Sequence, residues 1–227
     1  MSPGDETGRT GALEEVRRQD TGLIQIVDAA LADATRRAGR HLACRPGCTQ
    51  CCYGAFAVST LDAMRLRTAM AEMAATDPAQ AAAISSRAAR YLDAFGADFP
   101  GNRVTGVLGA SEEEQSAFEE FANDAACPAL NPESGLCEVY AARPMTCRIF
   151  GPPVRMDADT ESGLAVCELC FTEATQDEIA VAEMVVPHGE EQRVLGLLEE
   201  TGSGPGDTIV AYCLTLPLGS ERKPIAS

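Results

Sequence analysis

The chain has 227 residues, of which 45% are hydrophobic and 23% charged, enough for one large globular domain or two small ones. Its net charge of −16 argues against nucleic-acid partners, because the phosphate backbone is also negative. The first residues lack the basic start and apolar core of a secretory signal. No stretch approaches the roughly 18 apolar residues of a membrane helix, so a cytoplasmic protein without membrane partners is expected.

The first part of the chain favours a long helix followed by a loop. Residues 1–11 are polar and Gly-rich and are expected to form a flexible tail. A helix is predicted from about residue 12 to residue 40, on apolar residues that recur at helical spacing: Ile24, Val27, Leu31 and Ala34. Pro46 and Gly47 then exclude regular structure from the next segment.

Three further helix starts are predicted from capping signals, in which a short polar side chain accepts a hydrogen bond from the first turn. These signals are Ser59 with Asp62, Asp77 with Pro78, and Ser111 with Glu114. The helix after Ser59 would turn Leu66, Met70 and Met73 toward the core.

After Cys127 the chain is rich in Pro and Gly, which favours short turns and one small hairpin across residues 131–135. A turn is expected at residues 157–163, then one or two helices ending near Glu200 and an apolar segment at residues 208–216. The fold class is therefore mainly α, a helical domain with irregular cysteine-bearing loops and one short β-hairpin. We expect a single domain over residues 12–218 and a flexible tail at residues 219–227.

The chain contains ten cysteines, and nine of them lie in these irregular segments. The nine are Cys44, Cys48, Cys51, Cys52, Cys127, Cys137, Cys147, Cys167 and Cys170. Disulfides are rare in a reducing cytosol, whereas thiolates there bind soft and borderline metals. The nine thiols therefore indicate metal binding, and the isolated Cys213 is interpreted as a small buried hydrophobe.

The residues leave the metal and its role open. Four sulfurs suit structural zinc, while three cysteines from one loop and a fourth from elsewhere suit an iron–sulfur cluster. The spacing of Cys44, Cys48 and Cys51 also occurs in radical S-adenosylmethionine enzymes, but the repeating strand–helix units of those enzymes are missing here. A thiol redox sensor would use Cys51 with Cys52, or Cys167 with Cys170.

The ordered combination of cysteine motifs resembles the YkgJ-type cysteine-cluster family, a zinc- or iron-chelating domain. The resemblance covers about residues 41–170. It is carried by the tract at residues 44–52 and by the motifs Cys127-Pro128-Ala129-Leu130, Gly135-Leu136-Cys137-Glu138, Arg143-Pro144-Met145-Thr146-Cys147-Arg148 and Cys167-x-x-Cys170.

The resemblance implies that all nine cysteines chelate zinc or iron, the latter in an iron–sulfur cluster. One relative, the flagellin lysine methylase, pairs such a domain with methyl transfer, so an iron–sulfur-dependent modifying or electron-transfer enzyme is the alternative. No catalytic residue can be named from the sequence, and a protein partner stays open. Near the thiols, Arg148 is interpreted as a hydrogen-bond donor to sulfur or a carboxylate partner, Arg143 as shaping the loop, and His41 as ending the helix. His188 is expected to be exposed.

Overall fold

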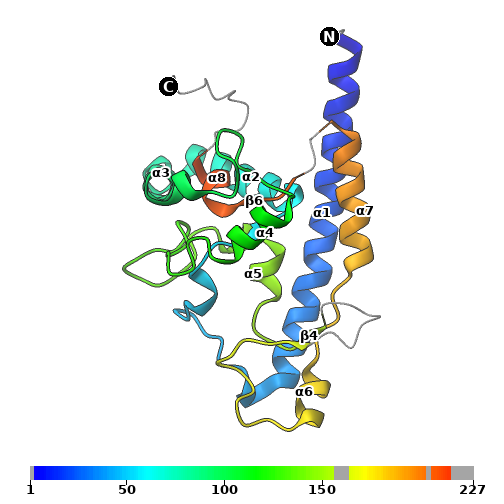
Figure 1. Cartoon of the computed structure of the whole chain (residues 1–227). Coiled ribbons are helices and arrows are strands. Elements are labelled where there is room, and N and C mark those ends of the chain that lie inside the picture. The colour runs from blue at the N-terminus through cyan, green and yellow to red at the C-terminus, as the bar shows by residue number, and fades with distance from the viewer. Residues whose placement is uncertain (1–2, 156–163, 203–205, 216–227) are drawn as a thin grey trace. The chain divides into compact units, whose positions relative to one another are not determined.

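The computed structural model describes residues 3–155, 164–202 and 206–215, and the chain divides into two compact units. Unit 1 is formed by Met1–Arg45 and Met145–Gly204, and unit 2 by Pro46–Pro144 and Pro205–Ser227. Both are mainly α, and the strands of the described residues form short antiparallel pairs (Figure 1). The predicted fold class is therefore confirmed, while the assignment of residues 12–218 to one domain stays a prediction.

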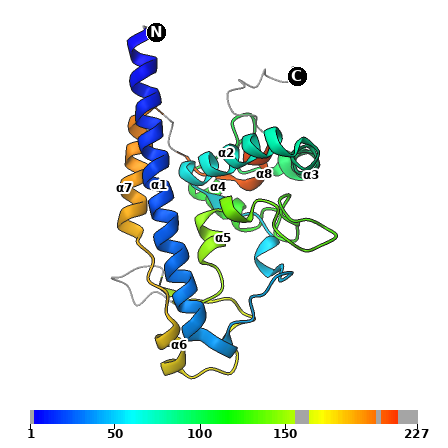
Figure 2. The same ribbon diagram turned by 180° about the vertical axis from the view of Figure 1, so that it is seen from behind.

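The long helix of unit 1 is α1 (Pro3–Ala38), and α7 (His188–Glu200) packs along it (Figures 1 and 2). Helix α1 begins upstream of the expected start near residue 12, so residues 3–11 of the expected tail are helical. Of the residues predicted on its apolar face, Val27 and Ala34 are buried and Ile24 and Leu31 are half-buried, while Val16 and Leu23 complete the buried face. From α7, Val194 and Leu198 are buried.

The rest of unit 1 is formed by short elements. The 3-10 turn η1 (Gly39–His41) follows α1, and α5 (Met145–Ile149) and α6 (Gln176–Ala182) both pack against α1. Strand β4 (Val154–Arg155) pairs with β5 (Leu164–Ala165). The turn expected at residues 157–163 lies outside the described residues.

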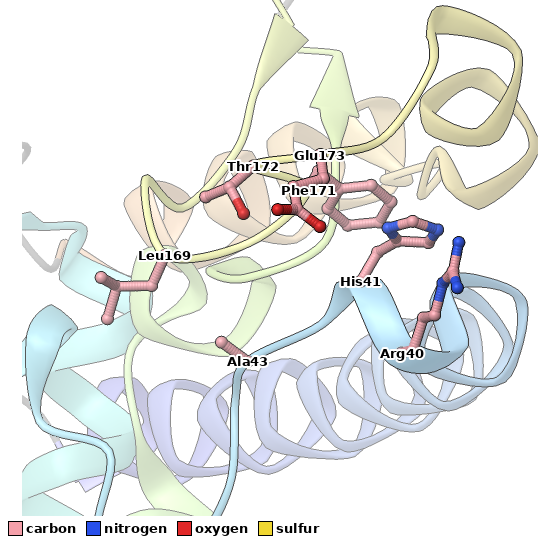
Figure 3. Close-up of a pocket in the computed structure, with 7 residues that line it drawn as sticks. All are labelled: Arg40, His41, Ala43, Leu169, Phe171, Thr172 and Glu173. Carbon is pink, nitrogen blue, oxygen red and sulfur yellow. The ribbon is translucent and has the colours of Figure 1, made fainter.

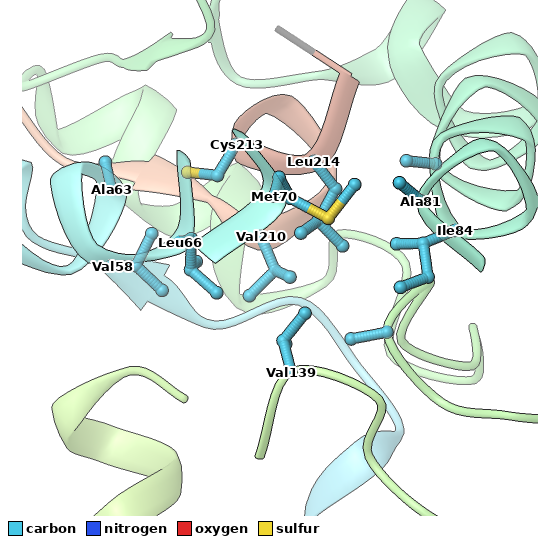
Figure 4. Close-up of a cluster of buried hydrophobic side chains, with 12 residues drawn as sticks. Val58, Ala63, Leu66, Met70, Ala81, Ile84, Val139, Val210, Cys213 and Leu214 are labelled. Carbon is cyan, nitrogen blue, oxygen red and sulfur yellow. The ribbon is translucent and has the colours of Figure 1, made fainter. Parts of the chain in front are cut away.

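Unit 2 contains a core formed by α2 (Thr60–Thr76), α3 (Pro78–Phe95) and α8 (Val210–Thr215). Strand β1 (Ala57–Val58) pairs with β6 (Thr208–Ile209), which joins the two distant stretches of this unit. The core side chains include Val58, Leu66, Met70, Ile84, Val139, Val210 and Leu214 (Figure 4). Cys213 is fully buried among them, which confirms its interpretation as a small hydrophobe.

A second cluster of unit 2 is aromatic. Phe99 lies edge-on to Phe121 and Tyr212, with ring centroids 5.8 and 5.0 Å apart. Around it lie the 3-10 turn η3 (Gly96–Asp98), the paired strands β2 (Gly101–Asn102) and β3 (Val107–Leu108), and helix α4 (Glu112–Glu119).

The three predicted helix starts are confirmed. Ser59 accepts a hydrogen bond from Asp62 N at 3.2 Å, and Asp77 accepts one from Gln80 N at 3.0 Å. Ser111 and Glu114 form a reciprocal capping box at α4. The hairpin predicted at residues 131–135 is a tight turn closed by the bridge between Leu130 and Cys137. The expected tail at residues 219–227 lies outside the described residues.

Candidate metal centre

The nine predicted ligands are shared between the two units. Unit 1 contains Cys44, Cys147, Cys167 and Cys170, and unit 2 contains Cys48, Cys51, Cys52, Cys127 and Cys137. The division falls inside the short tract at residues 44–52, between Arg45 and Pro46. Sequence spacing did not reveal this division, because neighbours along the chain are usually neighbours in space.

In unit 1, backbone contacts bring three cysteine-bearing segments together. Ala43 N donates a hydrogen bond to Cys170 Sγ at 3.3 Å, and Cys167 N donates to Gly151 O at 3.5 Å. Gly151 has a φ of +130°, and a Cβ placed on it would lie 2.9 Å from Cys44 Sγ. The thiol of Cys44 therefore lies directly against the segment that follows Cys147.

The Cys167-x-x-Cys170 motif forms a closed turn, in which Cys170 N donates to Cys167 O at 2.8 Å. The next residue, Phe171, has a left-handed φ of +57° and donates its backbone N–H to His41 O at 2.8 Å. Cys167 and Cys170 are both buried, in a small core with Ala38 and Ala182. The second pair of thiols is thus fixed against the end of α1.

A recess of about 230 Å³ lies beside Cys170 and is lined by Arg40, His41, Ala43, Leu169, Phe171, Thr172 and Glu173 (Figure 3). The His41 ring stacks on Phe171 at 5.6 Å between centroids, and His41 Nε2 lies 3.4 Å from Glu178 Oε1. His41 therefore closes the end of the α1–η1 segment, as expected. The recess gives this part of unit 1 a polar, solvent-open wall.

In unit 2, the cysteine tract pairs with the segment that carries Cys127. The 3-10 turn η2 (Gln50–Cys52) ends at Cys52, whose carbonyl accepts a hydrogen bond from Cys127 N at 2.7 Å. The Tyr53–Ala126 bridge and the bond from Gly54 N to Ala125 O extend this contact. Cys51 and Cys127 also line one cavity of about 20 Å³, comparable to a water molecule.

The hairpin that carries Cys137 lies against the same tract. Cys137 bridges to Leu130, three residues after Cys127. A Cβ on Gly135, at the tip of the turn, would lie 3.6 Å from both Gly47 and Thr49, the neighbours of Cys48. All five cysteine positions of unit 2 therefore lie on three contacting segments.

The thiols of unit 2 interact electrostatically. A side-chain hydrogen bond from Cys52 is the main cause that lowers the pKa of Cys51 to about 6, and the same bond, followed by burial, raises the pKa of Cys52. Burial raises the pKa of Cys127 to about 12 and also raises that of Cys137. Negative charge on one of these sulfurs raises the pKa values of the others, as expected for neighbouring acids.

Arg143 is a cation that influences two of these thiols. The Arg143 guanidinium lies 3.8 Å above the ring of Tyr140. Tyr140 begins the 3-10 turn η4 (Tyr140–Ala142), and Arg143 is the C-cap of this turn. Arg143 is 8% exposed. Its positive charge lowers the pKa values of Cys51 and Cys137. Arg143 was expected mainly to shape the loop. Its charge also influences the pKa values of Cys51 and Cys137.

The donor chemistry fits zinc or iron. None of the ten cysteines, all of which lie in the described residues, forms a disulfide, and thiolate sulfur is a preferred ligand of both zinc and iron–sulfur clusters. Among residues 3–155, 164–202 and 206–215, no three His, Cys, Asp or Glu side chains already form a group that could hold a metal ion. Within each unit, contacts between segments bring cysteine positions near each other, but the described side chains do not form a ligand shell in this structure.

Residues 43–171 match the CxxCxxCC family model, described as "Putative zinc- or iron-chelating domain", over more than half of the chain. The chain belongs to the CxxCxxCC family. The resemblance inferred from cysteine motifs is thereby confirmed, and with it a metal-chelating role for the CxxCxxCC domain. No curated protein and no solved structure matches the chain. Within the described residues, no helix is both long and apolar enough to cross a bilayer.

Several residues that support the CxxCxxCC loops were missed from the sequence. Arg87 donates from Nε to Pro128 O at 2.9 Å and also pairs with Glu138, next to Cys137. Arg148, which the sequence had singled out, pairs with the carboxylate of Asp28, but it is buried at 2% exposure rather than on the surface. These partners lie far apart in sequence, and no local signal connects them. His188 is exposed at the start of α7, as expected.

Proposed function

We propose that this CxxCxxCC chain is a cytosolic metal-binding protein that chelates zinc or iron through thiolates of Cys44, Cys48, Cys51, Cys52, Cys127, Cys137, Cys147, Cys167 and Cys170. The observation that carries the proposal is that these thiols lie on loops and short helical turns that are joined within each unit by hydrogen bonds. A reducing compartment keeps the thiols available as ligands, which is why we place the protein in the cytosol.

The metal would cross-link loops that have little regular structure of their own. The segment from Cys127 to Cys147 contains only the isolated bridge at Leu130, the turn η4 and the start of α5. Metal binding can contribute on the order of 10 kcal/mol to folding of such small thiolate domains. In this role the cysteine side chains rotate toward the metal as it binds, because a ligand shell commonly forms together with metal binding.

Neighbouring residues reduce the electrostatic cost of gathering thiolates. In unit 2, a shell of several thiolates would carry a net negative charge. The Arg143 guanidinium, which lowers the pKa values of Cys51 and Cys137, would offset part of that charge. In unit 1, the buried Arg148 directly follows Cys147 in α5. Each arginine is held in place, the first by Tyr140 and the second by Asp28.

The test is metal analysis and an electronic spectrum of full-length protein purified without oxygen. We expect zinc or iron in amounts comparable to the protein, and a lower melting temperature after a chelator removes the metal. The Cys213→Ala variant, which removes only the thiol outside the loops, should retain the metal. Protein that contains neither metal, and whose melting curve a chelator leaves unchanged, would refute the proposal.

A second candidate is an iron–sulfur-dependent enzyme with a modifying or electron-transfer role. The recess beside Cys170 favours it, since this recess is lined by the polar residues Arg40, Thr172 and Glu173 and by Ala43 and Leu169, the chain neighbours of Cys44 and Cys170. This candidate predicts brown protein with the visible absorption of an iron–sulfur cluster. Colourless anaerobic protein containing zinc in stoichiometric amount would eliminate it.

A further inference from the structure

The compact tract at residues 44–52 looks like one ligand group, but its first cysteine has different neighbours from the rest. Cys44 Sγ lies against Gly151, in unit 1. Cys52 pairs through its carbonyl with Cys127 N, in unit 2. Pro46 and Gly47, the latter with a φ of +86°, separate the two neighbourhoods.

Unit 1 contains four of the nine predicted ligands, which is enough thiols for one four-sulfur shell. Cys44 and Cys170 are joined through Ala43 N, which donates to Cys170 Sγ. Cys167 is joined to Gly151 by its backbone N–H, and Cys147 lies four residues before Gly151, in α5. Four thiolates are the number that a tetrahedral zinc ion or a cubane iron–sulfur cluster takes.

Unit 2 also contains enough thiols for a complete set. Cys127 N donates to Cys52 O at 2.7 Å, Cys137 bridges to Leu130 in the segment that follows Cys127, and Cys51 and Cys127 line one small cavity. Cys48 lies in the segment that contacts the tip of the Cys137 hairpin, so it is available as an alternative fourth ligand. No ligand from unit 1 is needed.

The buried arginines follow the same division. Among the described residues, Arg143 and Arg148 are the arginines classed as buried, and one belongs to each unit. Arg143 packs on the ring of Tyr140, three residues after the unit 2 thiol Cys137, and Arg148 follows the unit 1 thiol Cys147 in sequence. A shell of four thiolates around a divalent cation carries excess negative charge, so a buried cation beside each set is expected if each set binds its own metal.

We propose that the chain contains two thiolate metal centres rather than one, and that the family motif is divided between them. Cys44, Cys147, Cys167 and Cys170 form the first centre; Cys51, Cys52, Cys127 and Cys137 form the second, with Cys48 next to it. The inference rests on the proposed function, because it assumes that the thiols bind metal.

The test titrates metal-free, full-length protein with Zn²⁺ under anaerobic conditions and measures bound zinc per chain. Wild-type protein should bind about two equivalents, since each four-sulfur set completes one tetrahedral shell. The double variants Cys167→Ala/Cys170→Ala and Cys127→Ala/Cys137→Ala should each lose half of the zinc. Cys213→Ala, the matched control, should lose none.

A single shared centre gives a different result, in which either double variant loses all of its zinc. That outcome would overturn the inference while leaving metal binding intact. If wild-type protein binds no zinc and contains no iron when purified, the proposed function itself fails. The two failures are therefore distinguishable.

The wild-type protein also provides a test that does not depend on the folding of variants. X-ray absorption at the zinc edge of the fully loaded protein should show a shell of sulfur neighbours and no zinc–zinc scattering, because the two ions would not share ligands. A zinc–zinc distance in the range of thiolate-bridged clusters would contradict the inference.

Discussion

Arg148 Nη1 donates a hydrogen bond to Asp28 Oδ1 at 2.6 Å, which joins α5 to the middle of α1. The arginine side chain is 2% exposed, while that of the aspartate is 49% exposed. The pair therefore has one buried charge whose ionic partner reaches it from the surface. Since Cys147 precedes Arg148, this contact also holds a predicted metal ligand against the long helix.

Replacing Asp28 by Asn should destabilise unit 1 by about 1–2 kcal/mol. The buried guanidinium of Arg148 loses its charged acceptor, and water has little access to that guanidinium to replace it. Urea unfolding followed by circular dichroism measures this cost. Asp33→Asn is the matched control on the same helix, since Asp33 pairs with the exposed Arg36 and with Arg37. Its cost should be about 0.5 kcal/mol or less. Equal costs for the two variants would show that burial of Arg148 does not matter.

Glu138 ties the Cys137 hairpin to α3 through Arg87, and both side chains are mostly buried. Gln80 and Asn131 donate to the same carboxylate, at 3.4 and 3.3 Å. Glu138→Gln should cost about 1–3 kcal/mol of unfolding free energy, because the half-buried Arg87 then faces a neutral amide.

Hydrogen exchange of the amides in residues 129–138 should increase in the Glu138→Gln variant. The control is Glu133→Gln, on the exposed turn of the same hairpin, which should leave both stability and exchange unchanged. Unchanged exchange in Glu138→Gln would mean that the hairpin is held by backbone contacts alone.

Gly151→Ala should displace the Cys44 thiol. The φ of Gly151 is +130°, which disfavours any residue with a side chain, and the added Cβ would lie 2.9 Å from Cys44 Sγ. We expect a loss of about 2–4 kcal/mol and faster alkylation of Cys44 by iodoacetamide. Gly39→Ala is the control, because its φ is +51° but nothing lies within 4 Å of the added Cβ. It should cost about 1 kcal/mol and leave the alkylation rate of Cys44 unchanged.

The capping box of α4 should give a pH-dependent contribution to stability. Hydrogen bonds from Ser111, first from its side chain and then from its backbone, lower the pKa of Glu114 below its ordinary value of 4.5. A carboxyl group whose pKa is lower in the folded state stabilises the fold above its unfolded pKa. This stabilisation is lost as the pH falls through the folded value.

Ser111→Ala should therefore raise the pKa of Glu114 toward 4.5, as measured by NMR titration of the side-chain carboxyl. The stability difference between wild type and Ser111→Ala should shrink in acid, where Glu114 is protonated in both proteins. Ser116→Ala, within the same helix, should leave the titration unchanged. A Glu114 titration identical in wild type and Ser111→Ala would contradict the capping geometry.

Local features of the fold could be predicted from the sequence, and long-range features could not. Ser59, Asp77 and Ser111 begin helices because a cap acts within one turn, so three or four residues contain the signal. The nine loop cysteines and their family were likewise visible in the sequence, since their spacing is itself the motif. The start of α1 was placed too late because polar and glycine residues near residues 8–11 outweighed the helix signal.

The division of the thiols between units depends on contacts that no window of sequence contains. Cys44 lies beside Gly151, more than a hundred positions away, and Cys52 beside Cys127. The same is true of Arg148 with Asp28 and of Arg87 with Glu138. Such pairs depend on tertiary packing, so without the structure the tract at residues 44–52 reads as a single group of ligands.

The interleaved order of the two units determines when each can be completed during synthesis. Strand β1 and helices α2 and α3 emerge from the ribosome early, but their partners β6 and α8 come from residues 208–215. Helix α1 likewise waits for α7, which ends at Glu200. Both units of the nascent chain thus stay open until residues 188–215 have been translated, with their thiols accessible to solvent, and correct closure depends on long-range pairing.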